Sequence, residues 1–409
     1  MDCEQLVEAI HGSRWRAVIA VTGGGSQAIS ELLNVGGASR TLLEGLVPYS
    51  APALCDLLGA EPERYCSEAT ARAMAMASFE RAIRWSQPNQ PYHPHPGRSD
   101  AVGVGERLVG VSCTASLASD RPKRGDHRAH VGVQTVDYTA VTTLIMEKGA
   151  RTRREEERLV ARLVLNHLAS ACGIDDELPL ELLGDEELTR ARADAQPAWR
   201  SLMVRAIDAV RFAAGTEAPV ETGGSRSAQH PVPTVLFPGA FHPLHEGHHR
   251  MAAIAGELLG TAAEFEMSID NVDKPTLDYI EIESRLAQFA PDQVVWLTRA
   301  ATFLAKARLF RGAVFVVGAD TLARIADVRY YDSEQARDAA IEEIARLGCR
   351  FLVFGRVGDR GRFVVPHELK LPPALERLCQ SVPEDRFRED ISSTDIRRRA
   401  DDASCDEDD

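Results

Sequence analysis

Short apolar runs alternate with longer amphipathic stretches in the first part of the chain. The strand-like runs are residues 17–22, 107–113 and 130–136. The helical stretches are residues 67–85 and 155–174, where apolar positions recur at helical spacing. Strands and helices that alternate in this way predict an α/β domain, which we place at residues 1–173.

The same alternation returns, more regularly, in the last part of the chain. Strand-like runs occupy residues 234–241, 265–269, 293–298, 313–319 and 350–356. Helical patterns lie between them, at residues 248–260 and 333–348 among others. This order predicts a Rossmann-like domain at residues 234–400, in which a mostly parallel sheet has helices on both faces.

The segment between these two regions has a different pattern. Residues 177–195 and 199–212 are charged and predict helices, whereas residues 213–233 are rich in Gly, Pro, Ser and Thr. We therefore expect a helical connector and flexible linker over residues 174–233. The acidic tail at residues 401–409 is predicted to be disordered.

The composition limits the kinds of ligand and cellular environment that we expect for this chain. The 47 basic and 61 acidic residues give a net charge of −14, which argues against nucleic acid as the main ligand. No apolar run approaches the roughly 18 residues of a membrane span, and no signal peptide is visible. The eight cysteines form no CxxC pair and fit no metal-site spacing, so we expect a cytoplasmic protein without a metal centre. The oligomeric state stays open, a homo-oligomer included.

A turn rich in glycine and histidine follows the strand at residues 234–241. Gly239 allows a phosphate to approach the backbone, and Gly247 permits close packing at the start of the next helix. His245 and His248 are three residues apart and can face one side of its first turn. A helix N-terminus is a site for anions, so this turn is a candidate phosphate site. The alternatives are ordinary surface histidines, or a metal site that would also use His242 and His249.

A second motif, Asp390–Arg399, lies far downstream and reads DISSTDIRRR. Ser392, Ser393 and Thr394 are typical residues for the start of a helix. Arg397 follows one turn on and can offer a forked pair of donors to a phosphate. Taken alone, this motif is as well explained by an ordinary capped surface helix.

Together the two motifs resemble the HxGH nucleotidyltransferase superfamily, and more closely its nicotinamide and nicotinate mononucleotide adenylyltransferases. That family has a G-x-F-x-P-x-[HT]-x-G-H opening, a central G-x-D after a strand and a late S-[ST]-T-x-x-R. Here these read Gly239 to His248, Gly318 to Asp320 and Ser392 to Arg397. Phosphopantetheine adenylyltransferases and cytidylyltransferases share the first motif.

The resemblance implies transfer of AMP from ATP, which brings Mg²⁺, to nicotinamide or nicotinate mononucleotide. It implies three sets of residues. The catalytic set is His245, His248 and Arg397. The ATP-binding set is Gly239, Ala240, Phe241, Gly247, Ser392, Ser393 and Thr394. The substrate-binding set is Lys274, Thr302, Gly318 and Asp320.

Three positions in this region have alternatives. Lys274 is equally well explained as a solvated loop residue, and Thr302 is better explained as a helix cap. The family often has a Trp after its G-x-D that stacks on the nicotinamide ring. Tyr330 or Tyr331 takes that place here. The alternatives to this function are therefore another phosphorylated acceptor, such as phosphopantetheine, or a non-catalytic nucleotide sensor.

The first domain resembles the C-terminal domain of competence-damage-inducible (CinA) proteins over residues 17–135. Some members of that family hydrolyse nicotinamide mononucleotide with a serine and a lysine. Thr22 stands at the serine position, Leu54 at the lysine position, and Tyr49 is retained. Ser26 is another hydroxyl in the same Gly-rich loop, which could cradle a phosphate with its N–H groups. Since Leu54 cannot act as a base, the amidase dyad is degenerate.

Overall fold

The computed structural model describes residues 1–86, 107–120, 125–213, 216–220, 233–272, 275–357, 363–364, 369–388, 393 and 396–397. The chain forms two compact units, and each combines two stretches of sequence. Unit 1 comprises Met1–Ala206 and Asp273–Glu283, and unit 2 comprises Ile207–Val272 and Ser284–Asp409. Both are α/β, as the alternating pattern predicted. Across the described ranges, no helix has the length and apolar character that a membrane span needs.

Unit 1 is built on a six-stranded sheet with the order β2-β1-β3-β4-β5-β6. Strands β2, β1 and β3 are parallel, and β3 to β6 pair antiparallel. Its elements are α1 (Cys3–Gly12), β1 (Trp15–Thr22), α2 (Ser26–Asn34), α3 (Ala38–Thr41), β2 (Leu42–Leu46), α4 (Ala51–Leu58), α5 (Glu68–Ser86), β3 (Arg107–Ser116), β4 (His127–Gln134), β5 (Tyr138–Met146), α6 (Arg153–Ala171), β6 (Glu187–Asp194) and α7 (Pro197–Met203).

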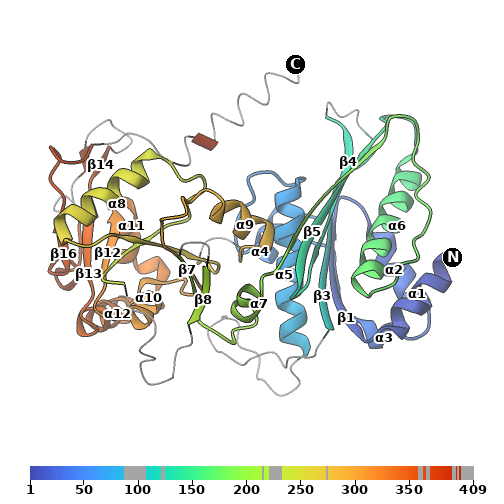
Figure 1. Ribbon diagram of the computed structural model, residues 1–409. Helices are drawn as coiled ribbons and strands as arrows, with labels where there is room; N and C mark the ends of the chain where they lie inside the picture. Colours follow the sequence, from blue (N-terminus) through green and yellow to red (C-terminus); the bar gives the residue numbers. More distant parts are fainter. Residues whose placement is uncertain are drawn as a thin grey trace. The chain divides into compact units, whose positions relative to one another are not determined.

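Helices cover both faces of this sheet. Helices α1, α2 and α6 lie on one face and α5 on the other (Figure 1). Helix α5 approaches the strands closely because two strand residues are glycines. A Cβ at Gly110 would lie 2.1 Å from the Ala75 carbonyl oxygen, and one at Gly132 would lie 2.7 Å from that of Ala71. The Ser112 hydroxyl donates to Ala71 at 2.6 Å, which fixes the helix on the sheet.

Unit 2 contains an eight-stranded sheet with the order β16-β13-β12-β9-β10-β11-β7-β8. Strands β16 to β11 are parallel, and β7 and β8 pair antiparallel at one edge. The chain builds β9, β10 and β11 outward on one side, then returns to place β12, β13 and β16 on the other. The order therefore reverses between β9 and β12, and in open α/β sheets ligands bind at the carboxyl ends of strands at such a point.

The strands of unit 2 are β7 (Ala209–Ala213), β8 (Thr216–Val220), β9 (Val235–Pro238), β10 (Glu264–Ser268), β11 (Val295–Thr298), β12 (Val314–Gly318), β13 (Arg350–Phe354) and β16 (Cys379–Ser381), with β14 (Arg356–Val357) and β15 (Phe363–Val364) as a separate pair. Its helices are α8 (Glu246–Leu259), α10 (Phe303–Leu309), α11 (Ala319–Ala326), the 3₁₀ turn η1 (Val328–Tyr330), α12 (Glu334–Arg346) and α13 (Pro373–Glu376). Helix α8 packs on one face of the sheet, and α10, α11 and α12 pack on the other. Helix α9 (Tyr279–Leu286) begins in the segment that belongs to unit 1.

The predicted helical connector is wrong at two places. Residues 187–194 form strand β6, which pairs with β5 at the edge of the first sheet. Residues 209–213 form strand β7, which pairs with β11. Among the described residues of this region, 197–203 are the helical ones, as α7. The helix-favouring residues Ala, Arg, Glu and Leu misled the prediction, because pairing with a distant strand overrides weak local propensity.

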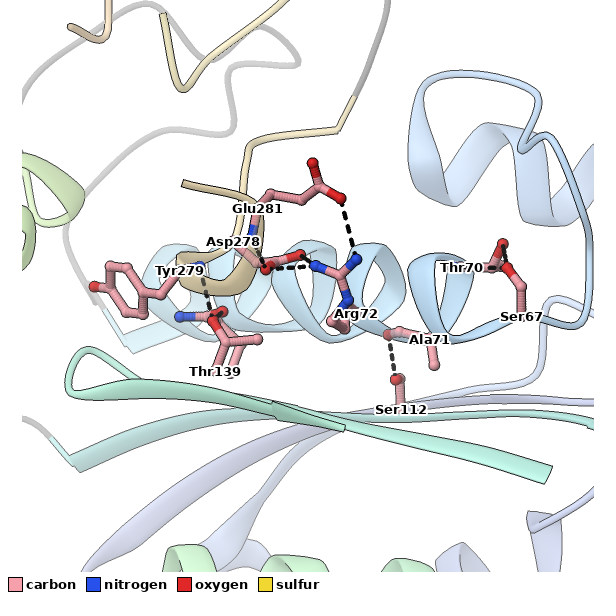
Figure 2. Close-up of polar contacts among 10 residues, drawn as sticks. Ser67, Thr70, Ala71, Arg72, Ser112, Thr139, Asp278, Tyr279 and Glu281 are labelled. Carbon is pink, nitrogen blue, oxygen red and sulfur yellow. Dashed lines mark hydrogen bonds and ion pairs between the residues drawn. The ribbon is translucent and has the colours of Figure 1, made fainter. Parts of the chain in front are cut away.

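The segment after residue 275 is anchored within unit 1 by a buried ion pair (Figure 2). Arg72 on α5 donates to both carboxylate oxygens of Asp278, at 2.7 and 2.6 Å, and to Glu281 at 3.1 Å. The side chains of Arg72 and Asp278 are 9% and 6% exposed. The Tyr279 N–H donates to the Thr139 hydroxyl at 3.0 Å. The segment is thus part of the fold of unit 1, although it lies between two strands of unit 2 in sequence.

Replacing Arg72 tests this anchor. In Arg72→Met the Asp278 carboxylate stays buried without its counter-ion, so we expect a loss of about 3–5 kcal/mol in the free energy of unfolding. Urea denaturation of the full chain measures it. Arg81→Met is the matched control on the same helix. Its pair with Glu44 is about a quarter exposed, so its loss should be only about 1 kcal/mol. Equal losses in the two variants would show that the buried Arg72–Asp278 pair contributes no more to the free energy of unfolding than the partly exposed Arg81–Glu44 pair.

Candidate active site

The turn after β9 has an unusual backbone that its sequence explains. Phe241 has a φ of +45°, a left-handed conformation that is rare for a bulky residue. Its ring is 1% exposed and packs edge-on against Phe237 and Phe265. Gly239 makes room for this ring, because a Cβ there would lie 2.5 Å from it. The aromatic core therefore holds the turn in shape at the carboxyl end of β9.

Two predicted catalytic histidines lie at the start of helix α8. His245 is the residue before the first helical turn, and His248 lies within that turn. Their rings stack with centroids 3.7 Å apart. Gly247 between them is buried, and a Cβ there would lie 3.0 Å from the His245 ring. The structure thus brings the two histidines together at a helix N-terminus, where the helix dipole favours an anion.

The hydrogen bond of His248 fixes its tautomer. The His245 N–H donates to Nδ1 of His248 at 3.2 Å, so the proton of the neutral ring resides on Nε2. Burial, and then the neighbouring His245 and His249, lower the pKa of His248 to about 3. At neutral pH His248 is therefore an uncharged donor through Nε2–H. A neutral imidazole can donate a hydrogen bond to a phosphate oxygen, but it does not act as an acid near neutral pH.

The late motif meets this turn. The Ser393 hydroxyl donates to the Pro243 carbonyl oxygen at 3.0 Å, and Nη1 of Arg397 donates to that of His242 at 2.5 Å. These contacts join residues that are 150 and 155 positions apart in the chain. The two motifs, each ambiguous alone, therefore form one site on unit 2. Ser392 and Thr394 of the same motif lie outside the described residues.

Two side chains that the sequence analysis missed hold the same turn. Nη1 of Arg285 donates to the Ala240 carbonyl oxygen at 3.1 Å. The Gln288 amide donates to the Phe241 carbonyl oxygen at 3.0 Å and accepts from the Leu244 N–H at 2.8 Å. No motif marks these residues. Arg285 lies in the last turn of α9 and Gln288 in the turn that follows, where the Gln288 N–H donates to the Arg285 carbonyl oxygen at 3.3 Å.

The other predicted substrate-binding residues of unit 2 lie in different structural positions. Gly318 precedes helix α11 at the carboxyl end of β12, beside β9 in the sheet, and Asp320 is an exposed residue of the first turn. They flank the point where the strand order reverses. Thr302 caps helix α10, since its hydroxyl accepts from the Ala305 N–H at 3.2 Å. Lys274 lies outside the described residues.

The two tyrosines considered in place of the family's Trp have partners inside unit 2. The Tyr331 hydroxyl donates to the Ile325 carbonyl oxygen at 2.9 Å. The Tyr330 hydroxyl accepts from Nε of Arg324 at 3.2 Å, and the Arg324 guanidinium lies 5.6 Å from the Tyr330 ring centroid. A nucleotide ring that stacked on Tyr330 would share it with Arg324.

In unit 1 the Gly-rich loop already holds an anion of the chain itself. The Glu157 carboxylate accepts from the Gly25 N–H at 2.9 Å, the Gln27 N–H at 3.0 Å and the Ser26 hydroxyl at 3.0 Å. The end of the predicted phosphate cradle, at Gly25 and Ser26, is thus occupied by a carboxylate.

Thr22 and Leu54, the two positions predicted to hold a degenerate dyad, both make contacts that stabilise unit 1. The Thr22 hydroxyl donates to the Pro48 carbonyl oxygen at 3.0 Å. Leu54, at the lysine position, is 1% exposed and packs with Ala20 and Met74 in a small core. Tyr49 is 69% exposed beyond strand β2. Leu54, at the predicted lysine position, is thus part of the hydrophobic core.

Within the described residues, no group of three or more His, Cys, Asp or Glu side chains is arranged to hold a metal ion.

A comparison with protein families matches the part of the chain that holds both motifs. Residues 236–399 match the family model described as cytidylyltransferase-like, which supports a nucleotidyltransferase activity in general. The search of curated proteins found no match. Among solved structures, the protein CihA from Agrobacterium tumefaciens is similar, with 19% identity over 42% of this chain and 96% of that one and a TM-score of 0.31.

A CinA superfamily protein from Escherichia coli has 18% identity over 42% of this chain and 90% of its own, with a TM-score of 0.30. One from Klebsiella pneumoniae has 13% identity over 42% and 99%, with a TM-score of 0.30. Similarity at this level assigns no activity or residue role to the chain.

The state of His248 can be measured directly. We expect its ring to stay neutral, with the proton on Nε2, from pH 8 down to about pH 4, because its pKa is about 3. Histidine-selective ¹⁵N NMR of the full chain follows this titration, and His248→Gln assigns the signal. In urea the same ring should titrate near 6.5. Since the folded pKa is the lower one, His248 favours folding above pH 6.5, and this contribution is lost as the pH falls toward 3. Titration near 6.5 in the folded chain would contradict the geometry.

Proposed function

We propose that unit 2 transfers AMP from ATP to nicotinamide or nicotinate mononucleotide, giving NAD or its acid analogue and pyrophosphate. One observation carries this proposal: the late Ser-Arg motif is bonded to the His-Pro turn of the first motif, at 3.0 and 2.5 Å. The pairing gathers an arginine, a serine, two histidines and a helix N-terminus at the carboxyl edge of a parallel sheet. These groups suit two phosphorylated substrates.

The reaction needs positioning and charge stabilisation above all. A phosphate oxygen of the mononucleotide attacks the α-phosphorus of ATP, and the bond from that phosphorus to the oxygen bridging to the β-phosphorus breaks. Pyrophosphate leaves with the electron pair. The attacking oxygen is already ionised, so no general base is required. An uncharged donor at His248 and a guanidinium at Arg397 fit this demand, because they stabilise charge without exchanging protons.

The residues divide the substrates between them in this proposal. His245 and His248 contact the ATP phosphates, and Ser393 and Arg397 hold the β- and γ-phosphates, with Mg²⁺ entering as part of the substrate. Gly318 and Asp320 lie toward the acceptor, beyond β12. The choice of a nicotinamide-type acceptor rests on the resemblance of the late motif, and the two tyrosines do not add to it.

Unit 1 does not act as an amidase in this proposal. Three features support that statement. The Thr22 hydroxyl donates to a backbone carbonyl, Leu54 is part of a core, and Glu157 fills the Gly-rich loop. Unit 1 then serves as a structural or nucleotide-binding partner of the transferase.

An acceptor assay tests the function. The full chain with Mg²⁺ and ATP is offered nicotinamide mononucleotide, nicotinate mononucleotide and 4′-phosphopantetheine in separate reactions, and mass spectrometry identifies the adenylylated product. We expect product and pyrophosphate with one or both mononucleotides. Product only with phosphopantetheine would reassign the acceptor, and no pyrophosphate in any reaction would leave a nucleotide-binding sensor.

Two substitutions test the roles in the same assay. We expect His248→Ala and Arg397→Met each to lower kcat/KM by about 10²–10³, the usual effect of losing one donor to a developing charge. Arg386→Met is the matched control, since Arg386 is exposed and its side chain pairs with Glu257 at 3.2 Å, away from the turn. It should keep the turnover of the unmodified chain. Unchanged turnover in His248→Ala would remove that histidine from the site.

A further inference from the structure

The turn between β9 and α8 is held from two directions. Its carbonyl groups at His242 and Pro243 accept from Arg397 and Ser393 of the late motif. The groups on either side of them, the Phe241 carbonyl and the Leu244 N–H, are both bonded to the amide of Gln288. One side chain therefore brackets the two residues on which the late motif docks.

The geometry points to Gln288 as a positioning residue for the nucleotidyl transfer proposed above. Its amide closes a ring with the backbone from Phe241 to Leu244, and this ring sets where the His242 and Pro243 carbonyls point. Arg397 and Ser393 follow those carbonyls. Gln288 touches no substrate in this inference and acts through the two residues of the late motif.

The backbone conformation explains why such a clamp is needed. Phe241 lies at a φ of +45°, a strained conformation that persists only where the surroundings enforce it. The neighbour of Gln288, Phe289, packs edge-on against the Phe241 ring with centroids 5.5 Å apart. Arg285, which is 8% exposed, holds the preceding carbonyl of Ala240 at 3.1 Å. The chain from Arg285 to Phe289 thus enforces the turn through backbone bonds and through the buried ring.

The amide group is specific in what it offers. Gln288 donates through Nε2 and accepts through Oε1 at the same time, which matches one carbonyl and one N–H of the turn. A glutamate would keep the acceptor for Leu244 and place an oxygen against the Phe241 carbonyl. A methionine of similar size would satisfy neither group.

Kinetics of a double-mutant cycle test the inference. We expect Gln288→Met to lower kcat/KM for ATP by about 10–10² through misplacement of the late motif. Because Gln288 acts through Arg397, the same substitution in an Arg397→Met background should cost less than about threefold more. Independent, multiplicative losses would overturn the inference, since they would mean that Gln288 acts without Arg397.

Gln293→Met is the matched control. Gln293 also uses both ends of its amide, accepting from the Ala290 N–H at 2.8 Å and contacting His249 at 3.2 Å, yet it does not reach the turn. It should leave kcat/KM unchanged. An equal loss in Gln293→Met would show that any half-buried amide of this unit matters, which also overturns the inference.

A second measurement does not depend on activity. In Gln288→Met, NMR should show faster hydrogen exchange at the Leu244 amide and a broadened Arg397 side-chain signal, and Gln293→Met should show neither. If these changes occur in a chain that adenylylates no acceptor, the proposed function fails and the positioning role stands. If transfer proceeds and Gln288→Met changes neither rate nor signals, the positioning role fails alone. Should Gln288→Met not fold, Gln288→Glu replaces it. The same fall in kcat/KM and the same broadening of the Arg397 signal are expected, whereas the Leu244 amide keeps its acceptor and should not exchange faster.

Discussion

The candidate site depends on one constraint: the carbonyl groups of the turn after β9 need hydrogen-bond donors. Backbone carbonyls withdrawn from water are costly when left unbonded. Arg397 and Ser393 provide donors for His242 and Pro243 and are themselves placed by doing so. The turn is thus a template for the arginine, and the histidines of α8 follow directly after it in the chain. A change in the turn therefore moves Arg397 and Ser393 together.

Much of the fold follows from local patterns. Helices α5, α6 and α12 and the parallel strands β9 to β13 of unit 2 lie where the apolar pattern predicts them, whereas the parallel edge strand β16 was not predicted. Strands β6 and β7 were mistaken for helix because their residues favour helix locally. Their pairing with β5 and β11 decides the outcome, and a partner strand outside the segment leaves no mark in its own periodicity. The anchor of Asp278 on Arg72 is harder still to foresee, since 206 positions separate them.

The site divides in the same way. His245, His248 and Arg397 stand in motifs whose residue types announce phosphate chemistry, so the sequence alone indicates them. Arg285 and Gln288 carry no motif, because they contact backbone groups that any residue would offer. Their role comes from the path of the turn, above all the left-handed Phe241, and no residue pattern encodes that path. A sequence motif therefore identifies the groups that meet a ligand more readily than those that hold them.

In unit 1, the carboxylate of Glu157 competes with any phosphate for the N–H groups of the Gly-rich loop. Glu157 is tethered to the same unit as the Gly-rich loop, so its effective concentration at the Gly25 and Gln27 N–H groups is set by the fold and does not dilute. A free phosphate would have to displace the Glu157 carboxylate from these N–H groups, and the displaced negative charge would remain nearby. The loop consequently needs no bound phosphate to keep its shape, because the chain supplies the anion itself.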